Sequence, residues 1–357
     1  MEQKKVGFAA IIGRPNVGKS TLMNHLIGQK IAITSERPQT TRNKIQTVLT
    51  TDEGQIIFVD TPGFLRKASN RLGEYMLDVS VGSLSDADVI LWLVEPSSYI
   101  GEGDREIAEA IRKSGTPAIL VINKIDTVKN EYLPGIINGW KDVLDFAEIV
   151  PVSGLRAKNL DELIKCIFLH LPEGPLLYDE ETLTDQSMRT IASEVIREKA
   201  LRMLNKEVPH GIAVTIERYH EREDGLVEIE ASIISEKDSH KGIIIGKGGA
   251  MLKRIGTASR KELEAMTGEK VFLKLFVKVR KDWRDNALLL NDYGYSKNKL
   301  GTVQHLRLGT PRIPRCGVQN SYTVSKEIKK DGRKTVNDER SGGTDRCGPL
   351  CTAGGGI

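Results

Sequence analysis

The chain has 357 residues, of which 39% are hydrophobic and 28% charged, as expected for a globular protein with two or three domains. Its longest apolar runs have the length of a strand, which argues against a transmembrane helix, and its first residues lack the apolar core of a signal peptide. Four cysteines without a C-x-x-C pair fit a reducing compartment better than a disulfide scaffold.

The net charge of +4 is distributed unevenly along the chain. Residues 296–357 contain 12 Lys/Arg and 5 Asp/Glu, a net of +7, so residues 1–295 carry a net of −3. Within that larger part, residues 237–295 hold 13 Lys/Arg against 7 Asp/Glu, a net of +6. A basic segment therefore lies inside an otherwise mildly acidic protein.

A phosphate-binding loop is predicted near the N-terminus. Residues 13–20 read Gly-Arg-Pro-Asn-Val-Gly-Lys-Ser and fit the pattern G-x-x-x-x-G-K-[ST]. An apolar run at residues 6–12 predicts a buried strand before the loop, and the spacing of residues 21–27 predicts a helix after it. Strand, loop and helix together make a chance match improbable, because this is the context that a P-loop requires.

The residue types of this loop suit a nucleotide phosphate. Gly13 and Gly18 let successive backbone N–H groups turn toward one anion, and the helix N-terminus adds partial positive charge. We expect Lys19 to reach the β and γ phosphates and Ser20 to bind Mg²⁺. The predicted nucleotide-binding residues of the loop are Gly13, Arg14, Pro15, Asn16, Val17, Gly18, Lys19, Ser20 and Thr21.

Residues 1–171 as a whole predict an α/β P-loop domain, with a mostly parallel sheet and helices on both faces, because strand and helix patterns alternate. The turn at residues 52–54 joins the first two strands after the P-loop into a hairpin. The predicted strands after the P-loop are 44–51, 55–59, 89–94, 118–122 and 148–152, and the predicted helices are 104–113, 138–146 and 159–171.

The motif Asp60-Thr61-Pro62-Gly63 follows a predicted strand, at the edge where open α/β sheets bind ligands. We expect the Asp60 carboxylate to hold Mg²⁺ through water and the N–H of Gly63 to contact the γ-phosphate. Phe64 comes next, where Ras-like proteins place a water-orienting Gln. Phe cannot orient water by hydrogen bonding, so either unassisted hydrolysis is slow or another group places the water.

Two further motifs predict that the base is guanine. In Asn123-Lys124-Ile125-Asp126, the Asp126 carboxylate can accept from both N1–H and the 2-amino group of guanine, a pair of donors that adenine lacks. In Ser153-Gly154-Leu155, a backbone N–H is expected to meet the guanine O6. The predicted GTP- or GDP-binding residues outside the P-loop are Asp60, Thr61, Pro62, Gly63, Phe64, Asn123, Lys124, Asp126, Ser153, Gly154 and Leu155.

Two loops are predicted to respond to the nucleotide. Thr40 and Thr41 lie between the first helix and the next strand, and one of them should close the metal site when GTP is bound; the sequence does not distinguish them. Residues 65–73 are polar and are predicted to form a mobile second switch. The predicted Mg²⁺ ligands are Ser20, Thr40, Thr41 and Asp60, and the predicted catalytic residues are Lys19, Thr40, Thr41, Asp60 and Gly63.

A second domain is predicted after an acidic linker. Residues 172–185 begin with Pro-Glu-Gly-Pro, which ends the preceding helix. Residues 186–295 then show the order α-β-β-α-α-β, with a helix at 187–204, strands at 212–219, 226–235 and 270–280, and a long helix at 250–266. This α+β order, together with the G-x-x-G loop that it contains, predicts a KH domain.

A G-x-x-G loop in this domain is predicted to bind RNA. Gly246-Lys247-Gly248-Gly249 follows an aliphatic run, and in KH modules such a loop clamps the backbone of about four nucleotides. The local excess of positive charge favours nucleic acid over a simple turn. The predicted RNA-binding residues are Ile243, Ile244, Ile245, Gly246, Lys247, Gly248, Gly249, Lys253 and Arg254.

With both domains in view, residues 4–295 resemble the bacterial Era family of GTPases, which join a G domain to a type II KH domain. The resemblance adds Pro38-Gln39-Thr40-Thr41-Arg42, Pro209-His210-Gly211 and Lys281-Asp282-Trp283-Arg284 to the motifs above. It implies Mg²⁺-dependent GTP hydrolysis coupled to binding of small-subunit (16S) ribosomal RNA near its 3′ end. It further implies a role in small-subunit assembly, in the cytoplasm and partly at the inner face of the cell membrane. We also expect the chain to be a monomer.

The chain departs from the family in two places. Gly154 stands where these GTPases more often have Ala, and the guanine contact is expected to survive because Gly keeps its N–H. Residues 296–357 lie beyond the resemblance and are predicted to be disordered, because they are Gly-rich at the end and have little periodicity. We expect this basic tail to be an incidental extension, with RNA or anionic lipid as the alternative ligands.

Two other functions compete with an RNA-binding switch. A metabolic kinase would also use a P-loop, but the guanine-reading motif at residues 123–126 argues against it. A membrane-associated signalling GTPase would use the basic C-terminal region as its effector surface.

Overall fold

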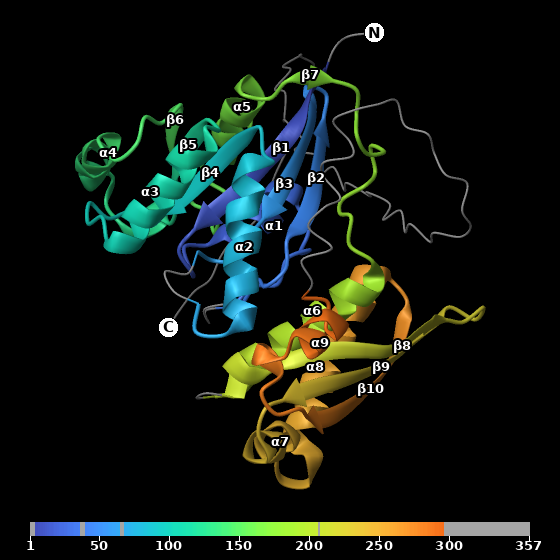
Figure 1. The fold of residues 1–357 in the computed structure, drawn as a ribbon. Helices are drawn as coiled ribbons and strands as arrows, with labels where there is room; N and C mark the ends of the chain where they lie inside the picture. The colour runs from blue at the N-terminus through green and yellow to red at the C-terminus, as the bar shows by residue number, and fades with distance from the viewer. Residues whose placement is uncertain (1–3, 36–39, 65–67, 206–207, 296–357) are drawn as a thin grey trace, which may run out of the picture. The chain divides into compact units, whose positions relative to one another are not determined.

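The computed structural model describes residues 4–35, 40–64, 68–205 and 208–295, all within one unit of the chain, Met1–Val324 (Figure 1). The predicted tail at residues 296–357, part of the second predicted switch and Gln39 lie outside these residues. None of the described helices is long and apolar enough to span a membrane.

The first domain is built on a mostly parallel sheet with the strand order β2-β3-β1-β4-β5-β6 (Figure 1). Its strands β4 and β5 are apolar and buried on both faces, as a sheet covered by helices requires. β2 pairs antiparallel with β3, which confirms the predicted hairpin, and a two-residue strand, β7, pairs antiparallel with β1. The strands are β1 (Lys4–Gly13), β2 (Ile45–Thr51), β3 (Gly54–Asp60), β4 (Val89–Val94), β5 (Ala118–Ile122), β6 (Glu148–Pro151) and β7 (Glu173–Gly174).

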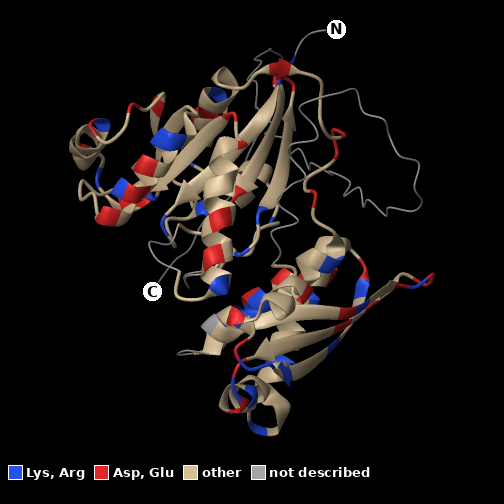
Figure 2. Cartoon of the chain, in the orientation of Figure 1, with Lys and Arg blue, Asp and Glu red and all other residues tan. Residues whose placement is uncertain are grey.

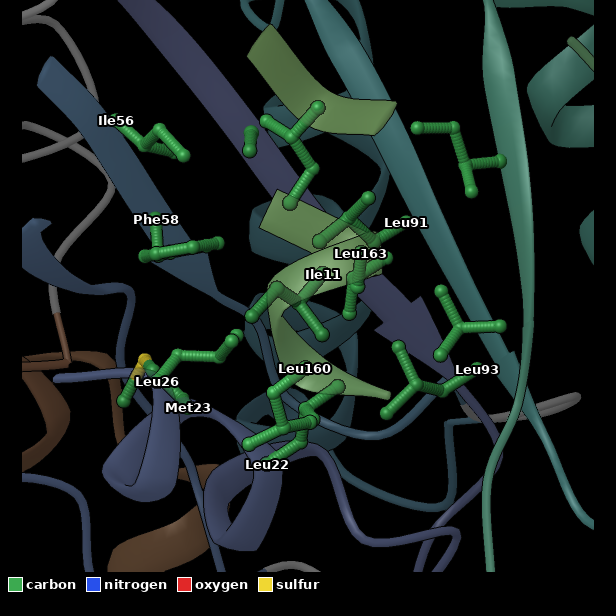
Figure 3. Close-up of a cluster of buried hydrophobic side chains, with 14 of the residues drawn as sticks. Ile11, Leu22, Met23, Leu26, Ile56, Phe58, Leu91, Leu93, Leu160 and Leu163 are labelled. Carbon is green, nitrogen blue, oxygen red and sulfur yellow. The ribbon is translucent and has the colours of Figure 1, made fainter. Parts of the chain in front are cut away.

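Helices cover both faces of this sheet. One face packs against α1 (Lys19–Ile27) and α5 (Leu160–Leu169), whose apolar side chains form a core with β1, β3 and β4 (Figure 3). The other face packs against α3 (Glu102–Ser114) and α4 (Leu133–Lys141). The side chains labelled in Figure 3 are Ile11, Leu22, Met23, Leu26, Ile56, Phe58, Leu91, Leu93, Leu160 and Leu163.

The helix α2 (Arg71–Ser85) is absent from the sequence prediction, which treats residues 65–73 as a switch loop. The start of this helix is indicated in the sequence by Asn70, a preferred N-cap residue. Its side chain accepts from the N–H of Gly73 at 2.9 Å. Apolar side chains at helical spacing follow, and Leu72, Met76 and Val79 are buried. α4 also begins earlier than the predicted residue 138, with proline in its first turn.

The second domain has the predicted order α-β-β-α-α-β. Its sheet has the order β10-β9-β8, in which β9 is antiparallel to β8 and parallel to β10. Apolar side chains from α6 and α8 pack on one face of this sheet, and the short α9 (Ala287–Asp292) follows it in sequence. The elements are α6 (Met188–Met203), β8 (Ala213–Glu221), β9 (Leu226–Ser235), α7 (Asp238–Ile245), α8 (Ala250–Thr267) and β10 (Lys270–Val279).

Candidate functional site

The P-loop joins the end of β1 to the start of α1, beside a cavity of about 1000 Å³. Gly18 has φ +99°, and a Cβ there would lie 2.5 Å from the Asn123 amide nitrogen, so this position needs glycine. The cavity is lined by the P-loop, by both candidate switch threonines and by Gly63 and Lys124. The structure thus brings together residues from four of the predicted motifs.

Lys19 is buried at the floor of this cavity. Its Nζ donates to the carbonyl oxygens of Gly13 at 3.1 Å and Arg14 at 3.0 Å. Burial lowers the pKa of Lys19 to about 8, although the nearby Asp60 carboxylate opposes this shift. A phosphate beside Nζ would add the negative charge that favours the protonated amine.

Three oxygen-bearing side chains meet next to Lys19. Asp60 Oδ2 accepts from Ser20 Oγ at 2.9 Å and from Thr41 Oγ1 at 3.3 Å, and the two hydroxyls lie 3.2 Å apart. The other carboxylate oxygen, Asp60 Oδ1, is buried without a hydrogen-bond partner among the described residues. Burial raises the pKa of Asp60, while Lys19 lowers it. Hard oxygen ligands around one carboxylate fit Mg²⁺, which keeps several waters and takes few protein ligands.

This geometry favours Thr41 as the switch ligand, because Thr41 Oγ1 donates to Asp60 Oδ2 at 3.3 Å. We expect Thr41→Ala to weaken Mg²⁺-dependent binding of a GTP analogue roughly tenfold, since one interaction with a charged group is worth about 1.5 kcal/mol. The neighbouring Thr40→Ala is the matched control and should change this affinity by less than about twofold. Titrating a fluorescent GTP analogue with and without Mg²⁺ tests both, and equal losses in the two variants would contradict the assignment.

The base-recognition motif also holds the P-loop in place. Asn123 Nδ2 donates to the carbonyl oxygen of Val17 at 2.9 Å, and Lys124 Nζ donates to that of Asn16 at 2.8 Å. Glu95, which the sequence prediction missed, accepts from Lys124 Nζ at 2.5 Å. Asp126 is exposed, with Oδ1 accepting from Ser153 Oγ at 2.5 Å. The carboxylate is therefore oriented at the edge of the site.

Two backbone N–H groups of the Ser153-Gly154-Leu155 motif are hydrogen-bonded within the protein. The N–H of Gly154 donates to Asn123 Oδ1 at 2.9 Å, and the N–H of Ser153 donates to the carbonyl oxygen of Lys158 at 3.2 Å. The contact of this motif with the guanine O6 stays a prediction. The Leu155 side chain itself is 64% exposed and is not needed for this contact.

The side chain of Phe64 packs against the interior of the first domain. Its side chain is partly buried against the apolar cluster beneath α3, and its N–H donates to the carbonyl oxygen of Gly13 at 3.1 Å. Phe64 therefore stabilises the P-loop through its backbone and the core through its ring. The position that would hold a water-orienting Gln is occupied by a core residue.

A second brace of the P-loop comes from α3. Arg14 Nε lies 3.1 Å from Asp104 Oδ1, and the Asp104 side chain is fully buried. Asp104 Oδ2 also accepts from the N–H of Gly101 at 3.0 Å, which caps the start of α3. The sequence prediction missed Asp104, because a capping residue of a helix carries no sign of a partner in a distant loop.

Arginines of α6 reach the loop that carries the two threonines. Arg202 lines the cavity and donates to the carbonyl oxygen of Thr34 at 2.8 Å, and Arg197 donates to that of Thr40. Arg42 follows the threonines and is fully buried. Its Nη1 donates to the carbonyl oxygen of Ile212 at 2.7 Å. Backbone and side chains next to the metal ligands are therefore tied to the second domain.

The G-x-x-G loop lies between α7 and α8, and Figure 2 shows Lys and Arg gathered around α7. Lys247, Lys253 and Arg254 are all exposed, so they form a basic surface along the loop and the start of α8. The prediction that Ile244 contacts RNA is wrong, because this side chain is fully buried in the core of the domain. Ile243, by contrast, is 50% exposed beside the loop.

Comparison with known families defines the class of protein. Residues 8–124 match the family described as 50S ribosome-binding GTPase, and residues 207–284 match the KH domain family. A P-loop GTPase domain is therefore followed by a KH domain, as the order of elements predicts.

Relatives then show the particular family. GTPase Era of Clostridium kluyveri is 50% identical over 291 residues, which span 82% of this chain and 99% of the relative. A crystal structure of Aquifex aeolicus Era bound to GDP·AlF4⁻ matches with a TM-score of 0.79 and 40% identity, covering 82% of this chain and 99% of the other. A structure of Era in complex with MgGDPNP and nucleotides 1506–1542 of 16S ribosomal RNA has the same TM-score and 41% identity, with the same coverage. The chain belongs to the Era family of GTPases.

Proposed function

We propose that this chain is a molecular switch that binds GTP with Mg²⁺, hydrolyses it, and binds small-subunit ribosomal RNA near its 3′ end during assembly of the small subunit. The observation that carries the nucleotide part is the meeting of Ser20, Thr41 and Asp60 beside the buried Lys19. These residues would hold Mg²⁺, which would neutralise charge on the β and γ phosphates. The proposed site of action is the cytoplasm, and the proposed state is a monomer.

The RNA part is supported by the KH match and by the basic surface around the G-x-x-G loop. The Era relative solved with nucleotides 1506–1542 of 16S ribosomal RNA favours the same ligand here. Glycines 246, 248 and 249 all have positive φ, so the loop exposes backbone that phosphates can approach. The competing proposal, a signalling GTPase that acts through its basic C-terminal region, has no support from the described residues.

Gly248→Asp tests this RNA site. Gly248 has φ +59°, a backbone conformation that strains any residue with a Cβ, although a Cβ there would meet open space and Asp adopts this conformation more readily than most residues. A new carboxylate beside RNA phosphates is expected to weaken binding about fivefold or more, because like charges 4 Å apart repel by about 1 kcal/mol even in water. The measurement is a titration of the full-length chain into a labelled 3′-terminal fragment of small-subunit ribosomal RNA.

Gly225→Asp is the matched control, because Gly225 has φ +77°, equally open surroundings and a place in the same domain, in the turn between β8 and β9. GTP affinity should stay unchanged in both variants. If Gly248→Asp and Gly225→Asp bind the RNA equally well, the loop is not the RNA clamp.

We further propose that nucleotide state and RNA affinity are coupled. Thr41 is a candidate metal ligand, while its neighbour Arg42 is buried with its guanidinium 5.7 Å from the ring centroid of Trp283. This adjacency supports a route by which a change at the metal site would act on Arg42 and, through it, on the second domain. We expect the RNA to bind about tenfold tighter in the presence of a non-hydrolysable GTP analogue than of GDP, within the range of measured coupling energies. If the affinity for RNA is the same with GDP, with the analogue and without nucleotide, the KH domain only anchors the chain to RNA and is not coupled to the nucleotide state.

A further inference from the structure

The strand β10 presents an unusual face to solvent. Its residues alternate, so that Val271, Leu273, Leu275 and Val277 belong to the core with α6 and α8 or pack against it. On the opposite face Phe272 is 56% exposed and Phe276 is 38% exposed. This outer face of β10 consists of Lys270, Phe272, Lys274, Phe276 and Lys278.

The lysines alone would have a simple structural explanation. β10 is an edge strand, and lysines on edge strands prevent pairing with other chains (Figure 1). Two exposed phenylalanines have no such explanation, because exposed apolar rings on an edge strand promote association. The rings therefore indicate a ligand.

The surroundings of the two rings distinguish among ligands. In the strand register Phe272 is next to Glu228 of β9 and Phe276 is next to Ser232, so neither ring has an apolar neighbour on that strand. A protein-docking site is normally a contiguous apolar patch. Isolated rings with cations between them are instead the pattern of proteins that stack unpaired bases and neutralise the adjacent phosphates.

Charge on this segment supports the same ligand. Residues 270–281 contain five Lys/Arg and no Asp/Glu. Lys274 Nζ lies 5.1 Å from the centroid of the Phe276 ring, so a cation is held beside the stacking surface. Lys274 also pairs with Glu230 at 3.6 Å and Lys278 with Glu217 at 2.8 Å. These pairs are exposed and therefore weak, so phosphate can replace the carboxylates.

We propose that the outer face of β10 is a second contact for single-stranded RNA, in which Phe272 and Phe276 each stack on one unpaired base. The glutamates of β8 and β9 repel phosphate, which leaves the outer edge of β10 for the RNA backbone. Four residues along a strand span about 13 Å, so the two stacked bases are not adjacent in the RNA. This inference rests on the proposed RNA-binding function and extends it beyond the four nucleotides that a G-x-x-G loop holds.

The test uses the full-length double variant Phe272→Ala/Phe276→Ala and two RNAs from the 3′ end of small-subunit ribosomal RNA, one of four nucleotides and one of about twelve. Loss of one stacked base weakens binding about fivefold or more, so the double variant should bind the longer RNA at least about 25-fold more weakly. Its affinity for the four-nucleotide RNA should not change. The variant Phe272→Trp/Phe276→Trp should retain the affinity for the longer RNA.

Leu288→Ala is the control for loss of an exposed apolar side chain, since Leu288 is 77% exposed in α9 of the same domain. If the double alanine variant binds the longer RNA as tightly as the unmodified chain while Gly248→Asp loses binding, the face of β10 is not an RNA contact and the proposed function stands. The proposal would also be overturned if the double alanine variant kept its RNA affinity but no longer bound a ribosomal protein in assembly extracts. An unmodified chain that binds neither RNA would overturn both the function and this inference.

Discussion

Asp126→Asn is expected to lower GTP affinity by roughly two orders of magnitude, because guanine loses two charge-assisted hydrogen bonds worth about 1.5–3 kcal/mol each and gains a partial replacement. The N1–H of the base can still donate to the amide oxygen of Asn. The 2-amino group of guanine, however, faces the amide N–H₂, so two donors meet. Xanthine carries an oxygen at that position and accepts from the amide, so xanthosine triphosphate should bind more tightly to the variant than GTP does.

The measurement is a titration of both nucleotides into the variant and the unmodified chain by calorimetry. Asp145→Asn is the matched control, since Asp145 is an exposed carboxylate of the same domain. Ser153 donates to Asp126 Oδ1 and can also donate to an amide oxygen, so the loop should keep its conformation. Unchanged GTP affinity in Asp126→Asn would remove the guanine assignment.

The sequence predicts the framework of the nucleotide site well. Motifs at the ends of β1, β3, β5 and β6 converge because parallel strands place their carboxyl ends at one edge of the sheet. Local rules predict this arrangement, since each motif follows an apolar strand of the expected length. The order of elements in the KH domain can be predicted from local patterns as well. Examples are β9 at residues 226–235 and the glycines before α8.

The contacts that hold the site in place cannot be predicted from the sequence. Arg14 meets Asp104, and Arg42 meets Ile212, across sequence separations that no local pattern encodes. An arginine in a polar loop is expected to lie at the surface, but Arg42 is buried. A similar limit explains the error at Ile244, because an aliphatic run on a short helix does not reveal which side chain faces the core.

Lys19→Ala is expected to abolish measurable GTP hydrolysis and to weaken GTP binding. Removal of one preorganised donor from a site where charge develops costs about 100- to 1000-fold in rate. Nζ lies within 3.1 Å of two P-loop carbonyl oxygens, so this ammonium is held at the floor of the phosphate site without needing to reorganise. The measurement is phosphate release under single-turnover conditions, together with the affinity for GTP and GDP.

Loss of Lys19 must be separated from loss of the fold. Its removal leaves the carbonyl oxygens of Gly13 and Arg14 without this donor, but it also removes a buried charge, so the two effects on stability partly cancel. Lys113→Ala is the control, because Lys113 is 76% exposed on α3 of the same domain. Suppose that the Lys19→Ala variant has the same melting temperature as the unmodified chain and hydrolyses GTP within twofold of its rate. Another cation would then be shown to neutralise the γ-phosphate.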